Sequence, residues 1–269
     1  MNSVRFRVVC TLAASVLGAS AARAAYVPIA LTPGSFNQDM VVEATAVNDP
    51  TAHYNNAVTA SMDGGTTKSG NTWYETGLNT AAPTTGLPHP GVVTSAADAT
   101  AGFLLLPYNA NHAVMLDSGA RTAALTLATP GRYSALSMLT SSGNGSGTMS
   151  LSLQFADGGA AVTVPGTVAS PDWFNATPIA INANGRVVPS TGVFANVSSG
   201  NPRLYQQNVT LPAEAAGRDL SAVNISWTGS GTTTHTALFA LSGTLVPEPG
   251  SLGLLGLGAL TLLARRRRA

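Results

Sequence analysis

The stretch TMSLSLQF, residues Thr148–Phe155, alternates apolar and small polar side chains with a period of two. Successive side chains of an extended chain point to opposite faces, so the four apolar residues lie on one face and the polar residues on the other. A strand with one buried and one hydrated face is typical of an antiparallel sheet. This stretch therefore predicts a half-buried β-strand.

The residues after this strand predict a tight hairpin. The sequence ADGG at 156–159 contains an Asp-Gly pair, which supplies the positive φ that a short turn needs, and AVTV at 161–164 then returns. Asp157 is the acid that such a turn favours, so its expected role is structural. Asp63-Gly64-Gly65 is interpreted in the same way.

The central region as a whole has this strand-and-turn character. No segment shows a sustained 3.6-residue apolar repeat, and Gly and Pro separate several short alternating runs. These features predict an all-β fold, a β-sandwich of jelly-roll type, and the lack of an internal repeat disfavours a propeller or solenoid. Further strands are expected at Met40–Val47, Phe103–Leu106, Ala113–Leu116, Ala123–Leu127, Tyr133–Leu139, Leu204–Thr210, Ala222–Trp227 and Thr236–Leu245.

Two segments are less regular. Thr59–Pro90 is rich in Gly and Pro and has few apolar residues, so it is expected to be a long loop region that buries little. Ser141–Gly147 consists of Ser, Gly and one Asn, and is expected to be a flexible turn joining two strands.

The first 24 residues have the features of a secretory signal peptide. Arg5 and Arg7 give a positive start, an apolar stretch follows, and Ala22 and Ala24 form an A-x-A cleavage site, so the mature chain is expected to begin near Ala25. Cys10 is the only cysteine and lies in this segment. The exported product is therefore expected to have no disulfide and no cysteine metal site.

The last 24 residues, 246–269, combine three features. Pro247 and Pro249 flank Glu248 after Val246, and because each proline lacks an amide donor this segment cannot extend a β-ladder. The apolar run Leu252–Ala264 has 13 residues, and as a helix of about 20 Å it falls short of a hydrocarbon core of about 30 Å. The run is followed by a basic cluster that is expected to stay cytoplasmic. The cluster consists of Arg265, Arg266, Arg267 and Arg268.

A Pro-Glu-Pro, a short Gly/Leu-rich segment and an Arg cluster in this order closely resemble the PEP-CTERM sorting signal of Gram-negative bacteria. The resemblance implies a membrane-bound exosortase that cleaves near Pro247-Glu248-Pro249, a transient association with the inner membrane, and delivery of the ectodomain to the cell surface or extracellular matrix. It also implies a link to exopolysaccharide. The alternative is an ordinary C-terminal transmembrane helix that keeps the β-domain tethered.

Removal of both ends changes the charge of the expected ectodomain, residues 25–245. It keeps 6 of the 13 Lys and Arg residues and 11 of the 12 acids, a net charge of about −5 against +1 for the whole chain. Lys68 is the only lysine. Because nucleic-acid binding needs clustered cations, DNA and RNA are excluded as expected partners.

The segment from Pro107 to Phe174 resembles a galactose-binding-like jelly-roll module found beside catalytic domains in some bacterial glycoside hydrolases. The resemblance implies the jelly-roll architecture for about a third of the ectodomain and does not assign a sugar site. The matching motifs are Leu106-Pro107-Tyr108-Asn109, Val114-Met115-Leu116, Pro130-Gly131-Arg132-Tyr133, Gly143–Gly147, Phe155-Ala156-Asp157-Gly158 and Asp172-Trp173.

Aromatic rings flanked by polar groups are the residue types that hold sugars. Trp73 and Tyr74 are the first candidates, because their surroundings are expected to bury little. Tyr108 and the pair Asp172-Trp173 are further candidates. The competing interpretation places Trp173 and Trp227 in the core, where large aromatic residues usually lie.

Catalytic and metal-binding patterns are not evident. His53, His89, His112 and His235 are dispersed, with no H-E-x-x-H spacing that would indicate zinc, and no G-x-S-x-G nucleophile motif is found. No cofactor is expected. Structural calcium is compatible with a jelly roll but has no supporting D-x-[DN]-x-[DN]-G run.

The sequence thus predicts a signal peptide at 1–24, a β-sandwich ectodomain at 25–245 and a sorting signal at 246–269. The leading hypothesis is an exported, non-enzymatic protein of the cell surface or matrix, processed by an exosortase and in contact with exopolysaccharide. Two alternatives stay open, a lectin-like carbohydrate-binding module and a secreted glycoside hydrolase with a pair of carboxylates.

Overall fold

The computed structural model describes residues 25–78, 85–174, 176–196, 200–229 and 231–246. The expected signal peptide, the Pro-Glu-Pro after Val246, the apolar run and the arginine cluster lie outside the described residues. Among the residues that are described, no helix is long and apolar enough to span a bilayer.

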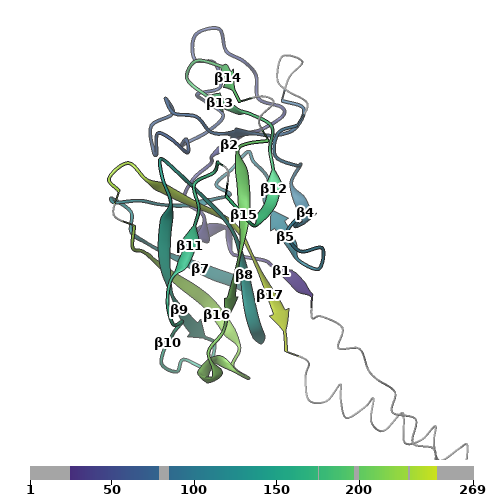
Figure 1. Ribbon diagram of the computed structural model, residues 1–269, viewed down its shortest axis with the longest axis vertical. Coiled ribbons are helices and arrows are strands. Elements are labelled where there is room, and N and C mark those ends of the chain that lie inside the picture. The colour runs from purple at the N-terminus through teal and green to yellow at the C-terminus, as the bar shows by residue number, and fades with distance from the viewer. Residues whose placement is uncertain (1–24, 79–84, 175, 197–199, 230, 247–269) are drawn as a thin grey trace, which may run out of the picture.

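The regular secondary structure of the described chain is almost entirely β-strand, as predicted (Figure 1). Two short 3-10 turns, Pro33–Ser35 and Ala213–Ala215, are its helical elements. The strands are β1 Tyr26–Ile29, β2 Val41–Val42, β3 Trp73–Tyr74, β4 Gly91–Thr94, β5 Gly102–Leu105, β6 Val114–Leu116, β7 Thr122–Gly131, β8 Tyr133–Gly143, β9 Gly147–Phe155, β10 Val162–Thr163, β11 Val168–Ser170, β12 Ile179–Asn182, β13 Arg186–Val188, β14 Val193–Ala195, β15 Arg203–Thr210, β16 Leu220–Trp227 and β17 His235–Leu245.

Two antiparallel sheets form the sandwich. Sheet 1 has the order β1-β17-β8-β15-β12, with β6 also paired to β17, and sheet 2 has the order β10-β9-β16-β7, with β11 also paired to β9. The long strands alternate between the sheets along the chain, β7, β9 and β16 in sheet 2 and β8, β15 and β17 in sheet 1. This alternation is the jelly-roll-like arrangement that the sequence predicts.

The predicted strand Thr148–Phe155 is confirmed as β9, and its apolar half faces the space between the sheets. There it meets apolar residues of β8, β16 and β17, including Met138, Val223 and Leu238. The predicted hairpin is also confirmed, since β10 pairs with β9 and Gly158 has a φ of 69°. The period-two pattern therefore builds the main core.

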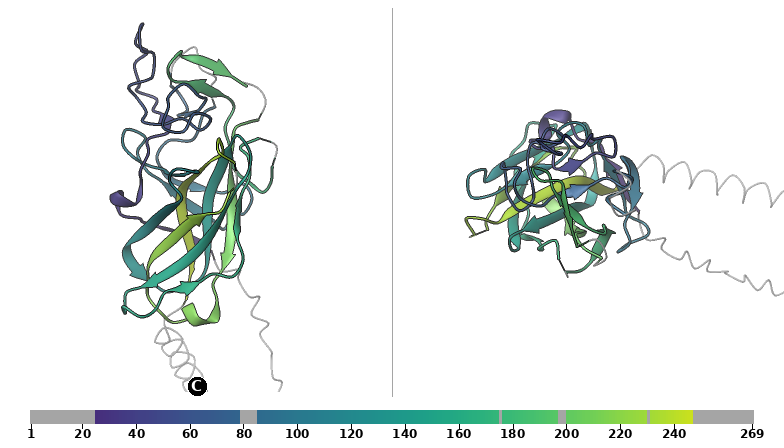
Figure 2. Two further views of the ribbon diagram at one scale, coloured as in Figure 1. Left: turned by 90° about the vertical axis from the view of Figure 1, so that its left-hand side faces the viewer. Right: turned by 90° about the horizontal axis from the view of Figure 1, so that it is seen from above.

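Sheet 1 is buried on both faces, unlike sheet 2. On β17, Leu238 points into the core between the sheets, whereas Phe239 belongs to a second core on the other side. This second core is covered by the segments around β2 to β5 and by Trp173. Residues 41–78 and 184–195, which we call the cap, form a third apolar cluster at one end of the sandwich (Figures 1 and 2).

The described part of Thr59–Pro90 is largely irregular apart from β3, as expected, but the expectation that it buries little is wrong. The described part of this segment buries Met62, Trp73, Tyr74 and Leu87 almost completely, because its few large side chains all turn inward against sheet 1 and the cap. The expected strand Met40–Val47 is also shorter than predicted, since only Val41 and Val42 pair, in parallel, with β3.

The expected flexible turn Ser141–Gly147 is only partly correct. Ser141, Ser142 and Gly143 are the buried last residues of β8, and the turn itself is Asn144-Gly145-Ser146, where Asn144 has a φ of 55°. Small side chains suit this place because the chain passes from one sheet to the other. Crowding therefore explains the small side chains of Ser141, Ser142 and Gly143, whereas the three turn residues are exposed.

The two ends of the described chain lie side by side. β1 pairs with β17 in the register Tyr26↔Thr244 to Ile29↔Leu241, so Ala25 and Leu245 emerge at the same end of the sandwich, away from the cap (Figure 1). Both predicted processing points are therefore next to the same edge of the fold.

Candidate functional site

The structure buries the two aromatic residues that were the first candidates for sugar contact. Trp73 and Tyr74 are each 0% exposed. The Trp73 ring packs edge-on against Trp173 and Phe239, with centroid distances of 4.8 and 5.2 Å. The expectation that this pair is exposed is wrong, because a fully buried ring offers no face to a glycan.

Tyr74 is a structural residue of the cap. Its hydroxyl donates a hydrogen bond to the backbone oxygen of Asn184 at 2.8 Å, and burial raises the pKa of Tyr74 to about 12. Its ring lies 5.3 Å from that of Phe194. These contacts join β3 to the segment that carries β13 and β14.

Tyr108 and Trp173 are also buried, at 2% exposure each, so their expected role as surface contacts is wrong. The Tyr108 hydroxyl donates to the backbone oxygen of Pro88, and Trp173 lies beneath the Arg186 guanidinium. The competing interpretation, that Trp173 and Trp227 fill the core, is confirmed.

Asp172 is half-buried, and its carboxylate holds the turn between β8 and β9. Its two oxygens accept the backbone N–H groups of Gly145 at 2.8 Å and Phe174 at 3.1 Å. Its neighbour Trp173 is out of reach of solvent. Asp172 is therefore a structural residue in this geometry.

Buried titratable groups gather where the cap meets sheet 1. Asp39 is 8% exposed, and its Oδ1 has no hydrogen-bond partner among the described residues. Burial, reinforced by the nearby Glu43 carboxylate, raises the pKa of Asp39 to about 8. The pKa of Glu43 is raised for the same main reason.

His112 lies beside Asp39 without bonding to it. Its Nδ1 donates to the backbone oxygen of Ala110 at 2.9 Å, and its Nε2 accepts the backbone N–H of Met40 at 3.3 Å. Asp39 Oδ1 is 3.6 Å from Nδ1, too far for a hydrogen bond. Because the ring is buried, the pKa of His112 falls to about 4, although the hydrogen bond to the Ala110 oxygen acts in the opposite direction.

The other carboxylate in this region has ordinary structural partners. Glu75 accepts the backbone N–H of Ala44 at 2.6 Å and pairs with His89 at 2.7 Å. No group of three or more His, Cys, Asp or Glu residues in the described part of the chain is arranged to hold a metal ion.

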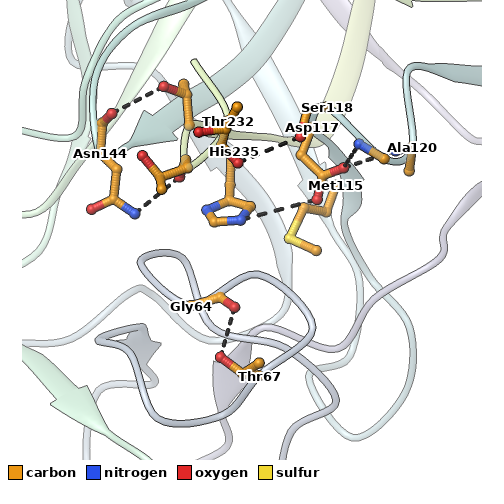
Figure 3. A network of polar contacts seen from close by, with 12 residues as sticks. Gly64, Thr67, Met115, Asp117, Ser118, Ala120, Asn144, Thr232 and His235 are labelled. Carbon is orange, nitrogen blue, oxygen red and sulfur yellow. Dashed lines mark hydrogen bonds and ion pairs between the residues drawn. The ribbon is translucent and has the colours of Figure 1, made fainter.

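His235 takes part in a separate polar network near the turn between β8 and β9 (Figure 3). Its Nε2 lies 4.0 Å from the Asp117 carboxylate. A Cβ added to Gly65 would come within 2.6 Å of this ring, so the Gly64–Thr67 loop packs closely against it. The network anchors the cap to the start of β17.

The exposed face that could contact a ligand is the outer face of sheet 2. One row runs straight across four strands, Ala124 of β7, Asn224 of β16, Ser152 of β9 and Thr163 of β10. The rows on either side are Thr122–Ser226–Ser150 and Thr126–Ala222–Gln154. We call these three rows the polar face, and all of its members are uncharged and partly or fully exposed.

The polar face is hollowed. A depression of about 600 Å³ lies over it, and polar residues such as Ser152, Thr163 and Asn224 line it together with apolar ones such as Ala123 and Ala124. Hydroxyl and amide groups both donate and accept hydrogen bonds, whereas the absence of charge in these rows gives no attraction for ions. The polar half of the stretch Thr148–Phe155 is the sequence signal for this site, although by itself it indicates only that one face of the strand is hydrated.

The fold and the tail together define the class of this protein, a β-sandwich domain followed by a C-terminal sorting signal. The tail is a PEP-CTERM protein-sorting motif, matched over residues 245–268, and such a motif marks a chain for export and sorting. No curated protein matches the chain.

The chain is also similar to a solved structure described as a non-crystalline cellulose specific carbohydrate-binding module. The alignment has 12% identity and a TM-score of 0.28, and covers 56% of this chain and 84% of that one. A TM-score of this size is too low for that module's ligand to bear on this chain.

Proposed function

We propose that the chain is an exported, non-catalytic protein of the cell surface or extracellular matrix, whose tail is removed by an exosortase-like membrane enzyme. The sorting motif at residues 245–268 carries this proposal. The fold supports it, because the matched motif begins at Leu245, the last residue of β17, and the expected signal cleavage point lies beside that strand's end. Both membrane-directed ends can then be removed without cutting the sandwich.

Intact mass of the protein from membrane and culture-supernatant fractions tests this proposal. The wild-type chain is expected in the supernatant without residues 1–24 and without the arginine cluster. Glu248→Ala together with Pro247→Ala is expected to keep the tail and stay in the membrane fraction, whereas Glu214→Ala, a change at an exposed acid of the sandwich, processes normally. Recovery of full-length wild-type chain in the membrane would instead identify a permanently tethered protein.

A second candidate function is contact with a neutral polysaccharide, which the uncharged and hollowed polar face favours. The hydroxyl and amide groups that predominate in these rows, at a strand spacing of about 4.8 Å, can exchange hydrogen bonds with the hydroxyls of an extended sugar chain. The producing cell's own exopolysaccharide is the first ligand to test, and it would be retained without any catalytic group.

Retention on immobilised exopolysaccharide and on a panel of neutral glucans tests this function. Ser152→Arg places a long charged side chain in the middle of the polar face and is expected to abolish retention. Thr94→Arg, an equal change at an exposed position of β4, is the matched control and leaves retention unchanged. Equal retention of both variants rejects the polar face as the binding site.

A further inference from the structure

The residues that precede the Pro-Glu-Pro are fixed inside sheet 1. Thr244 pairs with Tyr26 of β1 on one side and with Ala135 of β8 on the other. Beyond the strand, the backbone N–H of Val246 still donates to the backbone oxygen of Arg132 at 3.0 Å. The chain is therefore held by backbone hydrogen bonds up to the residue before Pro247.

Side chains close over this end of β17 as well. Gly243 lies under the ring of Tyr133 and the side chain of Ile29, and an added Cβ would be 2.4 Å from Cδ1 of Tyr133. Thr244 is 9% exposed, and Leu245, at 53%, is the first residue of the strand's end to reach solvent. Packing and pairing together hold residues 243–246 in place.

The spacer between this fixed end and the apolar run is short. Residues 247–251 are five in number, so they reach about 17 Å when fully extended. As long as the tail is in the bilayer, the end of the sandwich that carries Leu245 stands close to the membrane. An enzyme that cuts between the end of the sandwich and the membrane therefore has little room.

Recognition of an extended peptide uses its main-chain N–H and C=O groups. In the folded domain residues 243–245 pair with β8, residues 243 and 244 also pair with β1, and the N–H of Val246 donates to Arg132. Resting on the proposed processing of the tail, we infer that the sorting enzyme must also bind residues 243–246 to cut C-terminal to Val246, so that tail removal waits for local opening of the folded end of β17. The sandwich itself thus takes part in substrate recognition.

A linker insertion tests this inference. Six residues of alternating Gly and Ser placed between Val246 and Pro247 are expected to speed tail removal about tenfold in a pulse-chase experiment, because local opening of the strand end is no longer needed. The same linker between Gly158 and Gly159, in the exposed hairpin turn, is the control and leaves the rate unchanged. An unchanged rate with the first insertion overturns the inference.

A second variant loosens the strand end without lengthening the chain. Gly243→Ala forces Tyr133 and Ile29 aside, so tail removal is expected to be faster, with circular dichroism used to check that the sandwich still forms. Intact mass is expected to place the mature C-terminus at Val246 or beyond, and a terminus within β17 overturns the inference. If the wild-type tail is never removed, the proposed function fails instead.

Discussion

Asp39 is a carboxyl group that the fold buries with one oxygen unpaired. The unfolded chain releases its proton near pH 3.8, whereas the folded chain keeps it until about pH 8. Between these values the folded state binds more protons, so the contribution of Asp39 makes the free energy of unfolding fall as pH rises. His112, whose pKa drops from 6.5 to about 4, has the opposite effect over the lower part of this range.

The two residues therefore predict a specific pH profile. Their contributions oppose each other between about pH 4 and 6.5, and above that Asp39 alone lowers stability up to about pH 8. Asp39→Asn is expected to remove the fall above pH 6.5 and to raise the free energy of unfolding at pH 8 by roughly 1–3 kcal/mol. Urea denaturation at a series of pH values measures this.

Glu214→Gln is the control for that series, because it removes an exposed acid without touching the cap. Its profile is expected to follow the wild type throughout. If Asp39→Asn also follows the wild type between pH 6.5 and 8, then Asp39 does not retain its proton in the folded state.

At the scale of elements, the passage from β8 to β9 is the tightest point of the sandwich. Ser142 Oγ and Thr236 Oγ1 lie 2.8 Å apart, Trp227 Nε1 donates to Thr236 Oγ1 at 3.1 Å, and the N–H of Gly147 donates to Ser142 Oγ at 3.2 Å. An added Cβ on Gly147 would fall 2.0 Å from Thr236 Oγ1. The first residue of β9 has no room for a side chain.

Gly147→Ala is accordingly expected to lower the free energy of unfolding by about 2 kcal/mol or more, since the crowded network must move. Gly34→Ala, in the exposed 3-10 turn where an added Cβ meets nothing within 4 Å, is expected to stay within about 0.5 kcal/mol of the wild type. Thermal and urea unfolding compare the two. Similar losses for both would mean that the network is not rigid.

At the scale of the whole molecule, the neighbouring ends predict tolerance of circular permutation. Tyr26 and Thr244 are directly paired, so a short Gly-Ser linker can join Ala25 to Leu245 without distorting either strand. New termini fit at Gly158-Gly159, where the hairpin turn is exposed. The permuted chain is expected to fold, with a circular dichroism spectrum like that of the mature ectodomain and a cooperative thermal transition.

A permutant with new termini inside β17 is the comparison for that experiment. It is expected not to fold, because β17 pairs with β1, β6 and β8 and lies in both large cores. If the hairpin permutant also fails to fold, the two ends cannot be joined, or the hairpin opened, without disrupting the sandwich.

Sequence patterns predicted the sandwich well because a strand that is buried on one face alternates apolar and polar residues along its sequence. Leu151 and Ser152 are neighbours in the chain and lie on opposite faces of sheet 2, the first buried and the second partly exposed. The same reasoning failed for Trp73, since β3 is two residues long and its burial comes from Phe239 and Trp173, which are distant in sequence. A low local density of apolar residues was mistaken for exposure.

The sequence by itself determined the all-β class, the hairpin after Phe155 and the C-terminal sorting motif, because each depends on local chain chemistry. Only the tertiary structure decided which aromatic residues are buried, which polar rows face solvent together, and that the first and last strands pair. Those outcomes depend on contacts between residues far apart in the chain, and no local pattern encodes such contacts.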